Sequence, residues 1–308
     1  MRLVWLQDLD FMSVAGGAEF TDRVHFIAGL KRGHDITLVT PSSPDQEAAF
    51  GPADAVIVSN ATTFQLGGFQ TFQEMGRPLI WFLHDYFPIC KYRLFFPMAE
   101  KCGICYLKAR WLPHLTSARL LIWLSPLHRA SWLKIAPELE GIPYALIPSP
   151  VDGQQFYDLG LPRQGTITVN SLAPFKGRDN ILKWIEEHPQ EPVTVVGANN
   201  VPLPPNCTHL GLVSYHRLNE LYNRHQSFLH LPGSPMPFER TVAEAYLAGC
   251  RVIGNELIGA LSWPFFTEGP PATRREAVST ALAVAPRLFW EAVEGALVKV
   301  PKITPGGY

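Results

Sequence analysis

The stretch 228–254 constrains the fold of this chain more than any other. An apolar segment at 228–231 is followed by a Pro- and Gly-rich turn and then by a helical pattern of apolar positions at 242–248. Gly249 is suited to end that helix, and the apolar residues at 251–254 indicate another buried strand. The stretch therefore predicts a strand-helix-strand unit of a parallel sheet.

A second unit of this kind is expected at the N-terminus. A strand at 3–6 leads through Gly16 and Gly17 into a helix that ends near Gly33 and is followed by a strand at 36–39. The apolar positions of the helix are Phe20, Val24, Ile27, Ala28 and Leu30. A glycine pair lets the backbone approach a ligand such as a phosphate, and it equally suits a tight strand-to-helix turn.

Strands and helices alternate along the rest of the chain, which predicts an α/β fold with parallel sheets. Further strands are expected at 55–59, 78–83, 120–124, 144–147, 166–170, 193–197 and 208–211, and helices at 64–75, 108–115, 215–223, 276–283 and 286–297. Another helix is expected after Gly177, with Ile181, Leu182, Trp184 and Ile185 as its apolar positions. A length of 308 residues with 47% hydrophobic residues is sufficient for two cores. The stiff Pro-Ser-Pro-Val-Asp connector at 148–152 divides the chain into expected domains at 1–150 and 151–308.

Residues 236–245 read Met-Pro-Phe-Glu-Arg-Thr-Val-Ala-Glu-Ala. This segment resembles the Glu-Pro-Phe-Gly-Arg-Thr-Val-x-Glu-Ala donor motif of retaining glycosyltransferases with the GT-B fold, in the glycogen-synthase-like family 4 group. The Gly-Gly-Ala-Glu-Phe segment at 16–20 and the Lys-Gly pair at 176–177 resemble the same group. The resemblance implies two Rossmann-like parallel-sheet domains that face a cleft. The first domain would hold the acceptor and the second the nucleotide-sugar donor, and the last helix would cross back onto the first domain.

The resemblance also implies roles for particular residues. His84, at the end of the strand 78–83, would lie beside the transferred sugar, and Asp85 would orient that imidazole or act on the acceptor. Lys176, at a helix start, would neutralise the donor diphosphate. We expect catalytic roles for His84, Lys176 and Glu239, and donor binding by Gly16, Gly17, Lys176, Arg240, Thr241 and Glu244, with Glu244 on the ribose hydroxyls.

Three positions depart from the family pattern. Met236 replaces the acid that holds hydroxyls of the transferred sugar, Glu239 replaces a glycine, and Ser171 replaces an arginine. Either the sugar lacks a hydroxyl at that point, as a deoxy sugar or a pentose would, or Glu239 has taken over the contact. Glu239 is also placed for a simple charge interaction with a helix N-terminus.

Three cysteines, Cys90, Cys102 and Cys105, supply three of the four ligands of a structural zinc site. His84, His114 or a water would be the fourth ligand. The alternative is a set of reduced thiols without a metal.

The leading hypothesis is a retaining, metal-independent glycosyltransferase that uses a UDP- or GDP-sugar and a glycan, lipid or small-molecule acceptor. Met236 and Ser171 keep open a binding protein of the same fold that has lost turnover. A third alternative glycosylates a modified DNA base, but the formal net charge of −1 does not favour a DNA substrate. Neither a signal peptide nor an apolar run of membrane-spanning length is evident, so a cytoplasmic location is expected.

Overall fold

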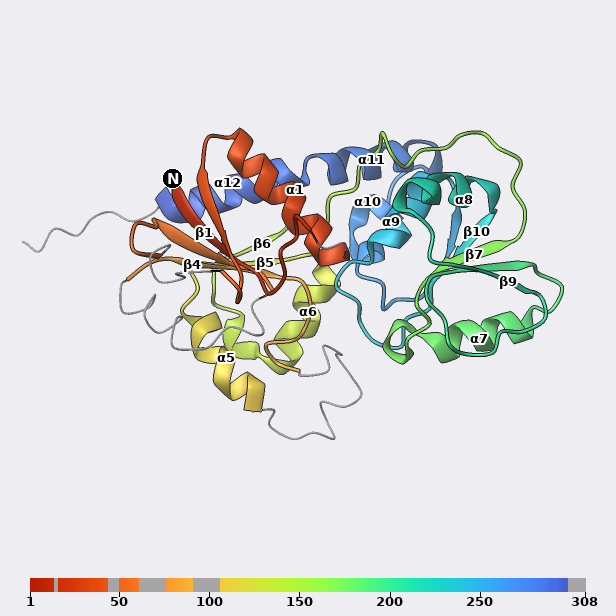
Figure 1. Ribbon diagram of the computed structural model, residues 1–308, viewed down its shortest axis with the longest axis horizontal. Coiled ribbons are helices and arrows are strands. Elements are labelled where there is room, and N and C mark those ends of the chain that lie inside the picture. Colours follow the sequence, from red (N-terminus) through yellow and green to blue (C-terminus); the bar gives the residue numbers. More distant parts are fainter. Residues whose placement is uncertain (14–15, 44–49, 61–75, 91–105, 299–308) are drawn as a thin grey trace, which may run out of the picture.

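The computed structural model describes residues 1–13, 16–43, 50–60, 76–90 and 106–298, and they fold around two parallel sheets (Figure 1). The first sheet has six strands in the order β2-β1-β3-β4-β5-β6. Its strands are β1 (Arg2–Leu6), β2 (Asp35–Val39), β3 (Ala55–Val58), β4 (Leu79–Leu83), β5 (Leu120–Trp123) and β6 (Tyr144–Leu146). β3, β4 and β5 are buried at every position, as expected for strands covered on both faces.

The second sheet has five strands in the order β11-β10-β7-β8-β9. Its strands are β7 (Thr166–Val169), β8 (Val193–Val196), β9 (Cys207–Gly211), β10 (Ser227–Leu229) and β11 (Arg251–Ile253). The described helices are α1 (Gly17–Lys31), α5 (Tyr106–Thr116), α6 (Pro126–Ile135), α7 (Arg178–Glu187), α8 (Leu218–Arg224), α9 (Arg240–Leu247), α10 (Pro264–Thr267), α11 (Pro271–Ala283) and α12 (Ala285–Val298). Short 3-10 turns precede some of them, including η2 (Pro174–Lys176) before α7. These two α/β halves confirm the predicted fold class.

Helix α12 follows the second sheet in sequence but packs beside α1 of the first sheet (Figure 1). Glu294 forms a bidentate ion pair with Arg32, and the Trp290 indole donates a hydrogen bond of 2.8 Å to the carbonyl of His25. A Cβ on Gly29 would lie 2.1 Å from the Trp290 ring, so the absence of a side chain there lets the two helices approach. The division into domains at 150 and 151 stays a prediction.

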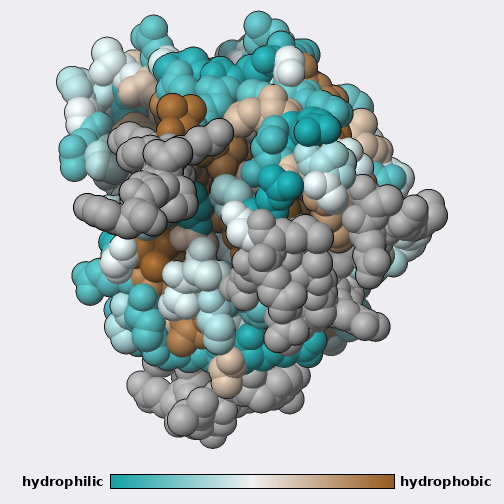
Figure 2. Space-filling model, turned by 90° about the vertical axis from the view of Figure 1, so that its left-hand side faces the viewer, coloured by the Kyte–Doolittle hydropathy of each residue, from teal (hydrophilic) through white to brown (hydrophobic). Residues whose placement is uncertain are grey.

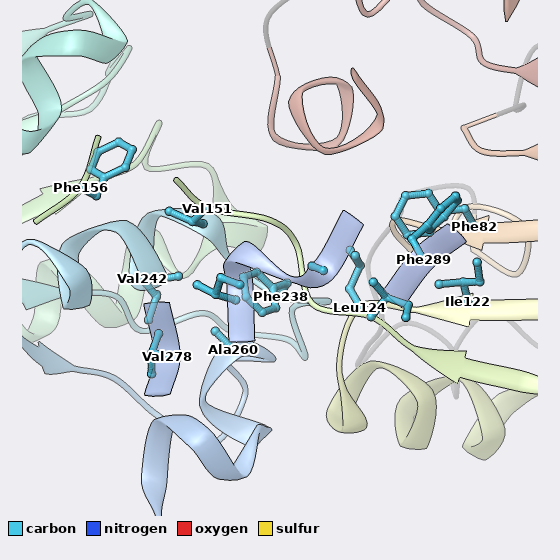
Figure 3. Close-up of a cluster of buried hydrophobic side chains, with 14 of the residues drawn as sticks. Phe82, Ile122, Leu124, Val151, Phe156, Phe238, Val242, Ala260, Val278 and Phe289 are labelled. Atoms are coloured by element: carbon cyan, nitrogen blue, oxygen red, sulfur yellow. The ribbon is translucent and has the colours of Figure 1, made fainter. Parts of the chain in front are cut away.

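One hydrophobic core cluster contains residues of both halves (Figure 3). Phe289 of α12 lies 5.1 Å from Phe82 of β4, measured between ring centroids. In Figure 3, Phe238 and Leu124 lie between the labelled group around Val242 and the group in which Phe289 lies beside Phe82. Leu124 and Phe238 of this shared core also line the cavity described below.

The apolar positions of α1 do not all face the core. Ile27 and Leu30 are 36% and 46% exposed, whereas the residues that α1 buries are Thr21, Asp22, His25, Phe26 and Gly29. A mostly polar face points inward because Asp22 and Thr21 form hydrogen bonds with residues of distant segments.

No helix among the described residues is long and apolar enough to cross a membrane. On the coloured surface visible in Figure 2, hydrophobic residues form small separate groups among hydrophilic ones. This view therefore shows no continuous apolar band among the described residues.

Candidate active site

A cavity of about 490 Å³ is lined by residues from both halves of the chain. Its walls come from the first turn of α1, the residues after β4, the η2 turn before α7 and the loop that leads into α9. Of the residues predicted from the sequence, those that line it are Gly17, His84, Asp85, Lys176, Glu239, Arg240 and Thr241. Gly16 and Glu244 are not among its described lining residues. The carboxyl ends of parallel strands and the starts of helices meet here, which is where α/β sheets bind ligands.

The His84 side chain is paired with a buried carboxylate, Asp22, which was not predicted from the sequence as a site residue. Its Nε2 lies 2.7 Å from Oδ1 of Asp22, and the hydroxyl of Ser59 donates a 2.7 Å hydrogen bond to the other oxygen of Asp22. Asp22 is fully buried and the His84 side chain is 3% exposed. Burial acts to lower the pKa of His84, but the charge and hydrogen bond of Asp22 outweigh it, so the pKa is raised. Two buried histidines without such a partner behave differently, because burial lowers the pKa of His25 and of His128 to about 3.

We expect Asp22→Asn to lower the pKa of His84, as measured by NMR titration of the histidine rings. Because the folded-state pKa of His84 is raised, its pairing with Asp22 stabilises the fold fully below the unfolded-state value of about 6.5. That contribution is lost as pH rises through the raised pKa, so the variant should be destabilised more at about pH 6 than at about pH 9.

The matched control for this prediction is Ser59→Ala, which removes a hydrogen bond from Asp22 but keeps its charge. The His84 pKa should remain raised in this control. Equal destabilisation of Asp22→Asn at both pH values, with an unchanged His84 titration, would show that the carboxylate does not set the charge of His84.

Lys176 ends the η2 turn and lies at the cavity wall, directly before α7. The following Gly177 has φ 82°, in the left-handed region. The side-chain amide of Asn170 donates a 3.1 Å hydrogen bond to the Lys176 carbonyl, which ties the turn to the end of β7. The predicted helix start after Lys-Gly is therefore confirmed, and the lysine is carried by a well-anchored turn.

Glu239 precedes α9 with φ 71° and ψ 82°. This left-handed conformation is natural for the glycine of the family motif and costs a residue with a Cβ roughly 1–2 kcal/mol. The Glu239 side chain is 10% exposed, and its Oε2 lies 3.4 Å from Nε2 of His230, which is 1% exposed. Burial acts to raise the pKa of Glu239, but the charge of Lys176 and then that of His230 outweigh it, so the pKa is lowered. The cavity wall thus presents an ionised carboxylate at neutral pH.

Met236 also lines the cavity, three residues before Glu239. Its backbone N–H donates a 2.8 Å hydrogen bond to the carbonyl of Leu257. Gly259 packs so closely that a Cβ there would lie 2.5 Å from the Met236 carbonyl. The backbone of Met236 is therefore packed closely against residues 257–259. Ser171, at the position of the expected arginine, is exposed and is not among the described lining residues.

The Arg240 guanidinium is engaged by protein groups. It donates to the Pro150 carbonyl and, at 3.0 Å, to the hydroxyl of Tyr215, and it lies 3.4 Å from Glu244 and 4.1 Å from the Phe20 ring centroid. The i,i+4 pairing of Arg240 with Glu244, one of the alternatives for this arginine, is therefore present.

Glu244, the residue expected to hold the ribose, is 1% exposed. Its carboxylate accepts hydrogen bonds from Tyr215 at 2.8 Å and from Tyr222 at 3.5 Å. Burial raises the pKa of Glu244, although Arg240 and the tyrosines oppose the shift. In this conformation both carboxylate oxygens are engaged by tyrosine hydroxyls within the protein. Ribose binding by Glu244 stays a prediction.

The remaining predicted residues lie at the start of α1, at the start of α9 and directly after β4. Gly17 begins α1 at the cavity, with Gly16 as the extended residue before it. Thr241 lies at the start of α9, and its hydroxyl is buried without a hydrogen-bond partner in the described part of the chain. Asp85 accepts a 2.8 Å hydrogen bond from the Phe87 N–H. The group that orients the His84 ring is Asp22, and a role for Asp85 on the acceptor stays a prediction.

The zinc hypothesis cannot be followed in the structure, because Cys102 and Cys105 lie outside the described residues. Cys90 is described as a half-buried thiol. Within the described ranges, no group of three or more His, Cys, Asp or Glu side chains is arranged to hold a metal. The zinc site stays a prediction.

Two functional candidates were missed from the sequence, Asp22 and His230. Asp22 stands between apolar positions of a helix, where a charged residue is rarely buried without a partner, and this was the available signal. His230 directly follows an apolar strand, as His84 does, at the edge where ligands collect.

Two parallel-sheet halves around such a cavity define the GT-B fold, and the solved structures that resemble this chain are GT-B glycosyltransferases. Anabaena Alr3699/HepE, in complex with UDP and glucose, has a TM-score of 0.66 and 14% identity over 96% of this chain and 100% of its own. Sucrose-phosphate synthase from Thermosynechococcus elongatus has a TM-score of 0.65 and 16% identity over 96% of this chain and 94% of its own. An alpha-glucosyltransferase bound to UDP and a 13-mer DNA with an HMU base has a TM-score of 0.59 and 12% identity over 97% of this chain and 100% of its own. The sequence matches no family profile and no curated protein.

Proposed function

We propose that this protein is a glycosyltransferase that moves a sugar from a nucleotide donor to an acceptor hydroxyl with retention of configuration. The observation that carries the proposal is the 490 Å³ cavity, in which Lys176, His84 and the starts of α1 and α9 converge. Helix N-termini and a fixed cation are suited to a diphosphate. A UDP-sugar is favoured because structural neighbours are solved with UDP, UDP and glucose, or UDP-glucose.

In the proposed reaction, the bond between the anomeric carbon and the diphosphate breaks while the acceptor oxygen bonds to that carbon from the same face. The acceptor proton passes to the departing diphosphate oxygen, so no enzymic nucleophile takes part. Lys176 and the backbone N–H groups stabilise the negative charge that develops on the leaving group. His84, kept cationic by Asp22 below its raised pKa, offers its other ring nitrogen toward the sugar.

Two alternative functions can be distinguished from the proposed transferase by experiment. A nucleotide-sugar binding protein without turnover is favoured by Met236 and by exposed Ser171, each of which removes a polar contact of the resembled motif. Glycosylation of a modified DNA base has less support, because the DNA-bound glucosyltransferase named above shares only 12% identity with this chain and the net charge here is −1.

The test is nucleotide release from a panel of UDP- and GDP-sugars, with and without glycan, lipid, small-molecule and modified-DNA acceptors. Acceptor-dependent release of UDP, with the product anomer assigned by NMR, supports the proposal. Tight binding of a nucleotide sugar by calorimetry without release under any condition supports the binding protein. An inverted product anomer would contradict retention while leaving transfer in place.

A further inference from the structure

Glu239 lines the cavity, and its side chain forms a buried pair with His230 for which no side-chain hydrogen bond is found among the described residues. Both ring nitrogens of His230 are without a hydrogen-bond partner among the described residues. The 3.4 Å approach of its Nε2 to Glu239 brings the two side chains together, and the Glu239 carboxylate makes no capping bond to α9. Buried polar groups are almost always paired, and an unpaired one destabilises the folded protein. Of the two residues, Glu239 lines the cavity, so a bound ligand is the natural source of hydrogen bonds to its carboxylate.

The backbone at Glu239 gives independent support for a ligand. The residue keeps a left-handed conformation, with φ 71°, that a glycine would adopt without strain. Strained non-glycine residues persist where surrounding structure enforces them, and they cluster at ligand sites. A strained residue that lines the cavity is therefore a candidate for ligand contact.

The chemistry of a carboxylate identifies the kind of group that it binds. An ionised carboxylate accepts hydrogen bonds and donates none, so it suits a hydroxyl and repels a phosphate. Met236, in the same loop, offers only a weakly accepting thioether. His230, at 1% exposure, lies behind Glu239 and contacts no solvent, so it acts on the ligand only through the carboxylate.

We propose that Glu239, positioned by His230, accepts hydrogen bonds from at least one hydroxyl of the transferred sugar and replaces the acid that Met236 lacks. This inference rests on the proposed function and narrows its donor: the sugar carries a free hydroxyl toward the start of α9. A donor that is deoxy at that carbon is then a poor substrate.

The test compares the best nucleotide sugar of the panel with its monodeoxy analogues, through kcat/KM or through Kd if turnover is slow. For the wild-type protein, one analogue should lose about 10- to 100-fold relative to the parent sugar, as expected for a hydrogen bond to a charged group. In Glu239→Gly this loss should shrink to within about threefold, because the partner of that hydroxyl is gone. Glycine suits the backbone at 239, so the variant should unfold at no lower temperature than the wild type.

His230→Gln tests the positioning role. If His230 positions Glu239, its replacement should reduce the loss of kcat/KM or affinity for that one deoxy analogue. If His230 is merely structural, its replacement should lower the melting temperature and affect all donors alike. The double variant Met236→Glu, Glu239→Gly should again discriminate against the deoxy analogue, because its carboxylate stands at the position that the acid has in the resembled motif. Unchanged deoxy losses in Glu239→Gly would overturn the inference and leave the transferase intact, whereas failure of every nucleotide sugar to bind the wild type would overturn both.

Discussion

Lys176→Ala is expected to lower kcat/KM for nucleotide-sugar turnover by about 100-fold or more. Lys176 lies at the cavity wall on a turn that Asn170 anchors, directly before α7. Arg240, a second basic residue of the described wall, is engaged by Pro150, Tyr215 and Glu244, so it does not replace the lost charge without giving up those contacts. Loss of one preorganised group that stabilises a leaving anion typically costs ~10²–10³ in rate. Steady-state kinetics with a UDP-sugar provide the measurement.

The matched control is Lys183→Ala on the same helix-turn unit. Lys183 is 75% exposed and lies 3.8 Å from Glu187 in an i,i+4 pair, so its removal should change neither rate nor stability appreciably. If Lys176→Ala retained near wild-type kcat/KM, the diphosphate would have to be neutralised elsewhere and the assignment would be wrong.

Gly177→Ala is expected to destabilise the protein by about 2–5 kcal/mol. Two costs add up: that of holding a residue with a side chain in the left-handed conformation, and that of the steric overlap of its Cβ. A Cβ on Gly177 would lie 1.8 Å from the carbonyl oxygen of Leu231 and 2.8 Å from Cα of Pro232. Both atoms belong to the backbone of the loop after β10, which cannot yield as a flexible side chain would. Thermal and urea denaturation give the measurement.

Gly33→Ala separates the two contributions. Gly33 has φ 83°, nearly the same as Gly177, but a Cβ there would meet no atom within 4 Å. Only the conformational cost, about 1–2 kcal/mol, should appear in this variant. Equal losses for the two substitutions would show that the loop after β10 moves to admit a methyl group.

The order and type of the described elements were determined largely by the sequence itself. The strand expected at 78–83 is β4 (Leu79–Leu83), and the helix expected at 286–297 is α12 (Ala285–Val298). Continuous apolar runs between Gly and Pro turns and apolar residues at helical spacing are local signals, so they are legible without knowledge of the partners. The places of His84, Lys176 and Glu239 at the cavity follow from the same logic, because strand ends and helix starts share one edge of a parallel sheet.

Only the tertiary structure decided which polar groups are paired and which face the cavity. Asp22 meets His84 across 62 residues of sequence, and that contact turns the inner face of α1 into a polar one. Glu244 accepts hydrogen bonds from Tyr215 and Tyr222, whereas Glu239 and His230 meet without side-chain hydrogen bonds to any described residue. Such pairings depend on distances between segments far apart in the chain, and neither spacing nor propensity specifies those distances. Periodicity therefore predicts the elements, while burial and long-range contact determine the charge and hydrogen bonding of the side chains they carry.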